Sequence, residues 1–147
     1  MLRRALLVIF VLSIAGTALA GCGSASSTAT ESELKMAPMS MMPADVKSAA
    51  VVTQQAYQFA VANPDVTKHI PCYCGCGTMG HTSNYMCYVK SVGADGAVNF
   101  DSHAIGCSIC VDITQDAMRL FKQGKSTAEI KAYVDKTYSR FGPSNMP

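Results

Sequence analysis

The first clear hydrophobic pattern lies between Asp45 and Asn63, where apolar residues recur at the spacing of a helix. The apolar positions are Val46, Ala49, Val52, Ala56, Phe59 and Ala60. Asp45 suits the N-cap of such a helix, and Asn63-Pro64 supplies a stop signal. The pattern predicts one amphipathic helix with its apolar face on a core.

Two further helices are predicted in the last third of the chain. The apolar face of the first consists of Ile109, Ile113, Ala117, Leu120 and Phe121. Gly124 follows it as a helix stop, and Ser126-Thr127-Ala128-Glu129 then matches the capping-box pattern of a helix start. The inward stripe of the second helix, which runs up to Arg140, consists of Ile130, Tyr133, Val134, Thr137 and Tyr138. We expect two antiparallel helices.

A short β-hairpin is predicted between the helical segments. Tyr85 to Val92 alternates, Gly93-Ala94-Asp95-Gly96 has turn residues, and Ala97 to Phe100 completes the pair. The fold class is therefore mainly α: a small domain of about three helices with a Cys-rich loop and a short hairpin. We expect a single domain over residues 45–142, because about one hundred residues bury one modest core, and a tail over residues 143–147.

The N-terminal segment is typical of an export signal. Arg3 and Arg4 precede an apolar stretch, Ala5 to Ala15, that is too short to span a bilayer. Leu19-Ala20-Gly21-Cys22 resembles the bacterial lipobox, which implies cleavage of a signal peptide, residues 1–21, and acylation of Cys22 with chains such as palmitate. We therefore expect an extracytoplasmic lipoprotein anchored to the bacterial cell membrane. The alternative is an ordinary secretory leader in which Cys22 is incidental.

The apparent basic charge of the chain comes from this leader. The whole sequence has 12 Lys+Arg against 10 Asp+Glu, and removing Arg3 and Arg4 leaves ten against ten. A nucleic-acid footprint needs clustered basic residues on a strongly basic domain. The mature chain has neither, so nucleic acid is excluded as a partner.

Residues 22–44 are predicted to form a flexible, Met-containing tether. Gly21 to Ala29 is rich in Gly, Ser, Ala and Thr, which is a linker composition. Four methionines follow: Met36, Met39, Met41 and Met42. Thioethers are soft ligands that suit Cu(I), whereas methionines also pack loosely on irregular surfaces. Copper capture and simple packing both stay open.

The candidate chemistry lies in six of the seven cysteines, which fall between Cys72 and Cys110. Cys72, Cys74 and Cys76 alternate in Pro71-Cys72-Tyr73-Cys74-Gly75-Cys76, so an extended backbone would direct their sulfurs to one side. Such neighbours rarely form a relaxed disulfide, because their Cα separation approaches the upper limit of about 6.8 Å. Binding one metal ion, or pairing with distant cysteines, is easier.

Further candidate ligands follow the triple cysteine. Gly75 and Gly77 permit the backbone to fold around an ion, and His81 and Cys87 come shortly afterwards. His69 precedes the motif, but we assign it to a connector after the first helix.

Cys107-Ser108-Ile109-Cys110 forms a second half of this constellation, with His103 just before it. The pair begins a predicted helix, and a helix N-terminus lowers the pKa of a cysteine. A C-x-x-C in this position serves both as a redox pair and as a metal clip, so both interpretations remain.

Three interpretations of the six thiols stay open: three structural disulfides, a metal site, or a catalytic dithiol. The supply of six Cys and two or three His exceeds the four ligands of one tetrahedral zinc and favours metal. Copper, as Cu(I), and zinc both suit such ligands. The sequence contains no recognisable hydrolase motif or phosphate loop, and we assign no catalytic residue.

Pro71-Cys72-Tyr73-Cys74-Gly75-Cys76 resembles the bacterial family named for its PCYCGC motif, whose members are largely lipoproteins without an established activity. Gly80-His81, Cys87, Asp101-Ser102-His103 and the later C-x-x-C stand in a similar order, and the resemblance covers roughly Val46 to Arg140. It implies a shared fold and a shared metal or thiol site, but no substrate.

A weaker similarity concerns Cys107 to Gly142. The C-x-x-C at a helix start, Gly124-Lys125-Ser126 and Glu129-Ile130 are similar to the thiol reductases of cytochrome c maturation, which are exported, membrane-bound three-helix domains. The triple-cysteine loop departs from that family.

The sequence leads to the hypothesis of a membrane-tethered protein that binds and passes on copper or zinc, with a metal-donor or metal-acceptor protein as a possible partner. A thiol-disulfide oxidoreductase using Cys107 and Cys110, and a metal-free, disulfide-stapled interaction module, are the alternatives. The candidate metal ligands are Cys72, Cys74, Cys76, His81, Cys87, His103, Cys107 and Cys110.

Overall fold

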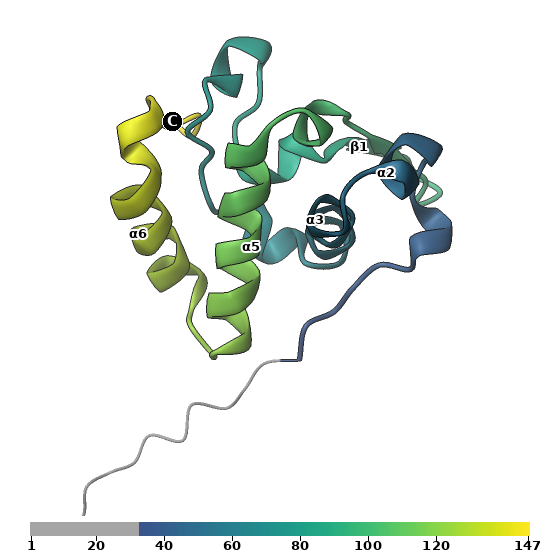
Figure 1. The fold of residues 1–147 in the computed structure, drawn as a ribbon, viewed down its shortest axis with the longest axis horizontal. Coiled ribbons are helices and arrows are strands. Elements are labelled where there is room, and N and C mark those ends of the chain that lie inside the picture. The colour runs from purple at the N-terminus through teal and green to yellow at the C-terminus, as the bar shows by residue number, and fades with distance from the viewer. Residues whose placement is uncertain (1–32) are drawn as a thin grey trace, which may run out of the picture.

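The computed structural model describes residues 33–147, and within them it is mainly helical with one two-stranded hairpin, as predicted (Figure 1). The five α-helices are α2 (Ala44–Ser48), α3 (Val51–Ala62), α4 (Pro64–Thr67), α5 (Ser108–Lys122) and α6 (Thr127–Tyr138). The strands are β1 (Val89–Val92) and β2 (Val98–Phe100). Short 3₁₀ turns are η1 (Met39–Met41), η2 (Cys76–Met79), η3 (Asn84–Cys87), η4 (His103–Ile105) and η5 (Ser139–Phe141). The predicted signal peptide and Cys22 lie outside the described residues.

The first predicted helix is divided into α2 and α3, so its predicted continuity was wrong. Ala49 and Ala50 adopt extended backbone angles between the two helices. The Gln54 side chain donates hydrogen bonds to the carbonyls of Lys47 and Ala49, at 2.9 and 2.8 Å. These bonds satisfy carbonyls that a continuous helix would have paired with its own backbone.

The boundaries of this region also differ from the prediction. Pro43, rather than Asp45, is the N-cap of α2, and Asp45 lies in its first turn. Asn63 ends α3 as expected, but Pro64 then begins α4 at the position where its missing N–H costs nothing.

The C-terminal helix pair forms as predicted. The Ser126 side chain accepts from the Glu129 N–H while the Glu129 carboxylate accepts from the Ser126 N–H, which completes the capping box. Gly124 takes a left-handed φ of 75°, and the N–H of Lys125 donates to the Leu120 carbonyl in a Schellman arrangement. In Figure 1, α6 and α3 flank α5, and both pack against it.

The hairpin is shorter than predicted. Strands β1 and β2 are antiparallel with Val89 opposite Phe100, and a bulge lies between Val89 and Ser91. The segment just before β1, predicted as its first half, is instead the 3₁₀ turn η3, so the strand prediction for Tyr85–Cys87 was wrong. Buried Asn84 fixes this turn, because its backbone N–H donates to the Ile70 carbonyl and its side-chain amide to the Cys110 carbonyl.

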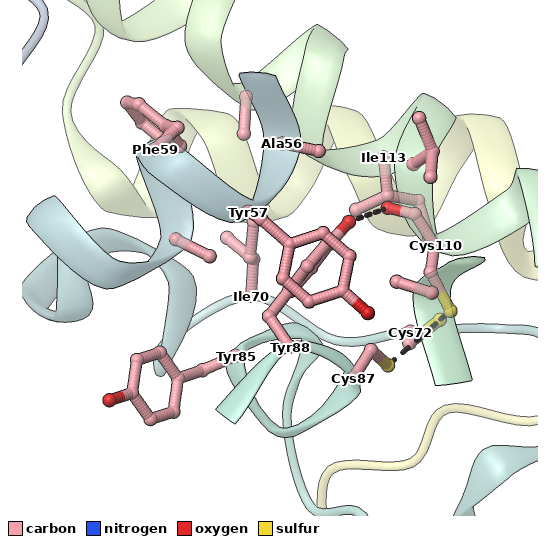
Figure 2. Packing of buried hydrophobic residues seen from close by; sticks show 14 of the residues in the cluster. Ala56, Tyr57, Phe59, Ile70, Cys72, Tyr85, Cys87, Tyr88, Cys110 and Ile113 are labelled. Carbon is pink, nitrogen blue, oxygen red and sulfur yellow. Dashed lines mark hydrogen bonds between the residues drawn. The ribbon is translucent and has the colours of Figure 1, made fainter. Parts of the chain in front are cut away.

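The core contains aromatic rings and sulfur side by side (Figure 2). The rings of Tyr57 and Tyr88 meet edge to face with centroids 4.9 Å apart. Cys72, Cys87 and Cys110 have no exposed surface and belong to the same cluster of buried residues. Each large apolar side chain buried in this way contributes roughly 1.5–3 kcal/mol to folding. The thiols are therefore held by the same packing that stabilises the domain.

The described part of the predicted tether, residues 33–44, packs on the domain instead of standing free of it. The N–H of Ala37 donates to the Gln58 carbonyl, and the Gln58 side chain donates back to the Ala37 carbonyl. Met42 is buried, whereas Met36 and Met41 are exposed. Within residues 33–147, no helix combines the length and apolar character needed to cross a bilayer.

Candidate metal centre

In the triple-cysteine segment, Cys72 and Cys74 lie between α4 and η2, and Cys76 is the first residue of η2. Gly75 has a left-handed φ of 85° and turns the chain into η2, which begins at Cys76. The sulfurs of Cys72 and Cys74 are 3.4 Å apart. The segment is therefore not extended through Cys76, because the glycine permits a turn, but the Cys76 sulfur still lies within 4.8 Å of the Cys72 sulfur.

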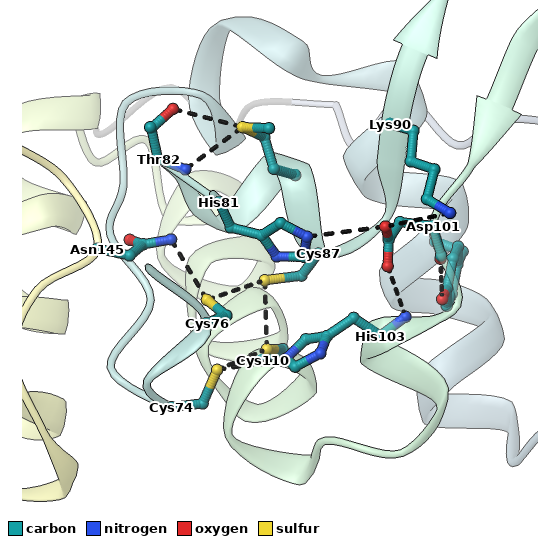
Figure 3. A network of polar contacts seen from close by, with 12 residues as sticks. Cys74, Cys76, His81, Thr82, Cys87, Lys90, Asp101, His103, Cys110 and Asn145 are labelled. Atoms are coloured by element: carbon teal, nitrogen blue, oxygen red, sulfur yellow. Dashed lines mark hydrogen bonds and ion pairs between the residues drawn. The ribbon is translucent and has the colours of Figure 1, made fainter. Parts of the chain in front are cut away.

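Cysteines from two other elements complete the cluster. Cys87 comes from η3, while Cys107 is the N-cap of α5 and Cys110 lies in its first turn. The Cys110 sulfur is 3.3 Å from those of Cys72 and Cys87. It is also 3.5 Å from the Cys74 sulfur, and the Cys76 and Cys87 sulfurs are 3.8 Å apart. Figure 3 shows part of this chain of sulfur contacts.

The candidate ligand atoms fall into two groups, within each of which all atoms lie within 4.8 Å of one another. The outer group, as we call it, consists of Cys74, His103, Cys107 and Cys110. The inner group consists of Cys72, Cys76 and Cys87. Three members of the outer group are half-buried, whereas all three of the inner group are buried. The structure thus contains a Cys/His cluster capable of holding a metal.

The sulfur spacing suits metal ligation. Thiolates around a tetrahedral Zn²⁺ have bonds of about 2.3 Å and therefore stand about 3.8 Å from one another. The contacts in the cluster range from 3.3 to 3.8 Å, and all six cysteines are free thiols. Small outward movements of the sulfurs would admit an ion.

The cluster divides its thiols into easily and poorly ionised ones. Hydrogen bonding with the Cys110 thiol, and then with that of Cys87, lowers the pKa of Cys72 well below the ordinary value of a thiol. Hydrogen bonding from the Cys87 thiol, with His103 adding to it, lowers the pKa of Cys74 to about 4. The donors show the opposite effect, because their hydrogen bonds to neighbouring thiolates raise the pKa values of Cys87 and Cys110. The lowered pKa values favour the thiolate form of Cys72 and Cys74, which is the form of cysteine that binds metal ions.

Cys107 departs from the expectation for a cysteine at a helix start. Its pKa is raised, chiefly by burial, and the hydrogen bond from the Cys110 backbone opposes this only in part. The favourable effect of the helix N-terminus is thus outweighed by desolvation. A thiol of this kind is a weak nucleophile near neutral pH.

The three histidines have different surroundings. His103 Nε2 lies 3.4 Å from the Cys74 sulfur, so its imidazole belongs to the cluster. His81 is buried beside it, with the two rings edge to face at 5.3 Å, but it is in neither ligand group. His69 is exposed and bonds to the Asp65 carbonyl, in keeping with its assignment to a connector.

His81 is held by a carboxylate. Its Nε2 lies 3.7 Å from Asp101 Oδ2, and its buried Nδ1 has no hydrogen-bond partner in the described part of the chain. The other oxygen of Asp101 accepts a 2.7 Å hydrogen bond from the His103 backbone N–H. Asp101 thus connects both histidines (Figure 3).

Two supporting residues could not be found from the sequence. Asn145, in the predicted tail, pairs with the Cys72 backbone in both directions, at 2.6 and 3.1 Å. Its amide also donates to the Cys76 sulfur at 3.4 Å. The Tyr88 hydroxyl donates to the Cys110 carbonyl at 2.8 Å. Neither residue stands in a motif, and both act across long sequence separations.

A family model described as "Protein of unknown function with PCYCGC motif" matches residues 8–145. No curated protein and no solved structure matches the chain. The weaker similarity to the thiol reductases of cytochrome c maturation therefore finds no support.

Proposed function

The chain belongs to the family of proteins of unknown function with the PCYCGC motif, and we propose that it binds a soft metal, Cu(I) or Zn(II), outside the cytoplasm. The observation that carries this proposal is the convergence of six thiols and one imidazole from distant parts of the sequence on one cluster. Thiolate and imidazole are the ligands that these ions prefer in proteins.

The connectivity of the cluster favours metal over structural disulfides. The Cys110 sulfur contacts three other sulfurs at 3.3 to 3.5 Å, whereas a disulfide would join it to only one. A metal-thiolate cluster makes use of all of these neighbours at once. The raised pKa of the half-buried Cys107 also speaks against a C-x-x-C that attacks partner disulfides.

The proposed location rests on the lipobox-like Leu19-Ala20-Gly21-Cys22. Acylation of Cys22 would hold the domain at the outer face of the cell membrane, with residues 23–32 between the anchor and the described domain. The candidate ligands on one side of the cluster are half-exposed. An anchored protein of this kind could therefore pass an ion to another protein or receive one from it.

The proposal is tested by metal titration of the full chain, purified in detergent micelles and kept reduced under anaerobic conditions. Native mass spectrometry after addition of Cu(I) or Zn(II) should show a stoichiometric complex. Replacing Cys72, Cys87 and Cys110 together by serine should abolish it, because these sulfurs lie at the centre of the cluster.

Exposed Met79 and Ser108 provide the controls, because Met79→Leu and Ser108→Ala leave every candidate ligand in place. Both variants should bind metal like the natural chain. Absence of a cysteine-dependent complex with either ion would overturn the proposal. Mass mapping that instead finds three metal-free bridges would identify a disulfide-stapled module.

A further inference from the structure

We propose that the cluster holds two metal ions that share the thiolate of Cys110. This inference rests on the proposed function and specifies the stoichiometry and geometry of the same site. One ion would lie in the outer group with Cys74, His103 and Cys107, and the other in the inner group.

The number of ligands supports two ions. The outer group provides four ligand atoms, three sulfurs and one imidazole nitrogen, which is a complete tetrahedral set. The inner group provides three thiolates and lacks one. Two tetrahedral ions with one ligand in common need seven ligands, which is the number that the two groups contain together.

The position of Cys110 supports its role as the shared ligand. Its sulfur lies 3.3 Å from Cys72 and Cys87 of the inner group, and 3.5 Å from Cys74 of the outer group. Cys110 also has no exposed surface and sits in the first turn of α5, between the two groups. A thiolate has several lone pairs, so it can bind two ions at once.

Local positive potential helps to hold the negative charge of such a cluster. Six thiolates with two divalent ions retain net negative charge, and the first turn of α5 presents the positive end of a helix dipole at Cys110. The Asn145 side chain adds an N–H donor to the Cys76 sulfur at 3.4 Å. Both contributions reduce the cost of burying the cluster.

The two sites differ in access. Cys74, His103 and Cys107 are half-buried, whereas Cys72, Cys76 and Cys87 are buried. An ion therefore enters and leaves through the outer site, and the shared Cys110 thiolate gives it a route to the inner site by exchange of one ligand for another. No change of oxidation state is involved.

The inference is tested with cadmium-113, a soft ion that accepts the same ligands and is observable by NMR. The reduced full chain in detergent micelles should bind two ions and give two signals that split each other, because scalar coupling between the ions passes through a shared ligand. A competing chelator should remove the outer ion first.

Variants assign the two signals. Cys107→Ser removes a ligand of the half-exposed outer site and should reduce the stoichiometry from two ions to one, with loss of the splitting. Cys76→Ser removes a ligand of the inner site, so only the outer ion should remain bound. Ser108→Ala, an exposed neighbour of Cys107, should retain both ions and their coupling. Cys107→Ser keeps the test informative if Cys76→Ser does not fold.

The outcomes separate the two proposals. A natural chain that binds no cadmium, copper or zinc would contradict the proposed function itself. Binding of a single ion, or of two ions without mutual splitting, would overturn only the shared-thiolate geometry and leave metal binding in place.

Discussion

Individual side chains outside the cysteine motif hold the cluster in position. The carbonyl of Cys110 accepts hydrogen bonds from the Tyr88 hydroxyl and the Asn84 amide, at 2.8 and 3.3 Å. Asp101 fixes the backbone of His103, and Asn145 fixes that of Cys72. Partners of this kind commonly tune metal affinity by 10- to 100-fold. The proposed ligands are thus oriented before any ion arrives.

Asp101→Ala should weaken metal binding by about tenfold or more. The Asp101 carboxylate accepts from the His103 N–H at 2.7 Å and lies 3.7 Å from His81 Nε2, so its removal would disturb both histidines. A competition titration against a chelator of known affinity measures the change. Asp112→Ala, on the exposed side of α5, is the matched control, and equal affinities for the two variants would contradict the role of Asp101.

Asn145→Ala should speed the loss of bound metal by about tenfold. The substitution removes the bond from the Cys72 N–H to Asn145 Oδ1 and the donor to the Cys76 sulfur, so the triple-cysteine loop becomes more mobile. Stopped-flow removal of the ion by a chelator gives the rate. Ser91→Ala, at an exposed position in β1, is the control, and an unchanged rate in Asn145→Ala would refute this role.

At the level of elements, the site is built where a helix start meets two turns. Helix α5 brings Cys107 and Cys110, η3 brings Cys87, and the turn at Gly75 redirects Cys76. Helices α3 and α6 pack on α5 and hold it in place. The candidate ligands therefore come from elements whose relative positions depend on the hydrophobic core.

Local signals predicted the elements that depend on local chemistry. Ser126 and Glu129 form their capping box, and Gly124 ends α5, because each acts on residues within about one turn. No such local signal marks the break at Ala49, because the freed Ala49 carbonyl accepts from the Gln54 side chain, five residues away. The strand prediction just after Asn84 likewise failed, because the buried Asn84 side chain donates to the Cys110 carbonyl and this contact holds the segment in a turn.

The candidate site was predictable in its ligand types more than in its arrangement. The sequence singled out all six clustered thiols and His103, which the structure brings together. It also suggested His81, which lies beside the cluster but outside both ligand groups. Asn145 could not be predicted, because its contact with Cys72 joins residues 73 positions apart.

Ser126→Ala should destabilise the reduced, metal-free domain by about 1 kcal/mol. The Ser126 hydroxyl is the N-cap of α6 and accepts from the Glu129 N–H, so its loss leaves that donor without its partner. Urea denaturation followed by circular dichroism gives the free energy of unfolding. Ser144→Ala serves as an exposed serine control, and equal stabilities of the two variants would show that the cap contributes nothing.

The Glu129 carboxylate should make the stability of α6 depend on pH in the acid range. The Ser126 backbone N–H, followed by the Ser126 hydroxyl and Lys125, lowers the pKa of Glu129 to about 2. Since the unfolded value is about 4.3, this stabilisation is complete above that pH and is lost as the pH falls towards 2.

Glu129→Gln removes this titration while retaining a side-chain oxygen that accepts from Ser126. The difference in unfolding free energy between the natural chain and the variant should therefore shrink between about pH 4.3 and pH 2. Urea denaturation at intervals across this range measures it. A difference that does not vary with pH would contradict the pKa assignment.

In the molecule as a whole, the thiol cluster and the hydrophobic core are continuous. Cys72, Cys87 and Cys110 have no exposed surface and pack among Tyr57 and Tyr88. Asn145, two residues before the last residue of the sequence, also pairs with the triple-cysteine segment. Binding of an ion would therefore stabilise the entire domain rather than one loop.

The most direct test is the metal content and free-thiol count of the full chain purified anaerobically from its native membrane. We expect stoichiometric copper or zinc. The six clustered cysteines should resist alkylation until a chelator removes the metal, after which all six should react in the unfolded chain. Protein that contains no metal, with its cysteines already paired in disulfides, would show that the cluster does not bind metal in the cell.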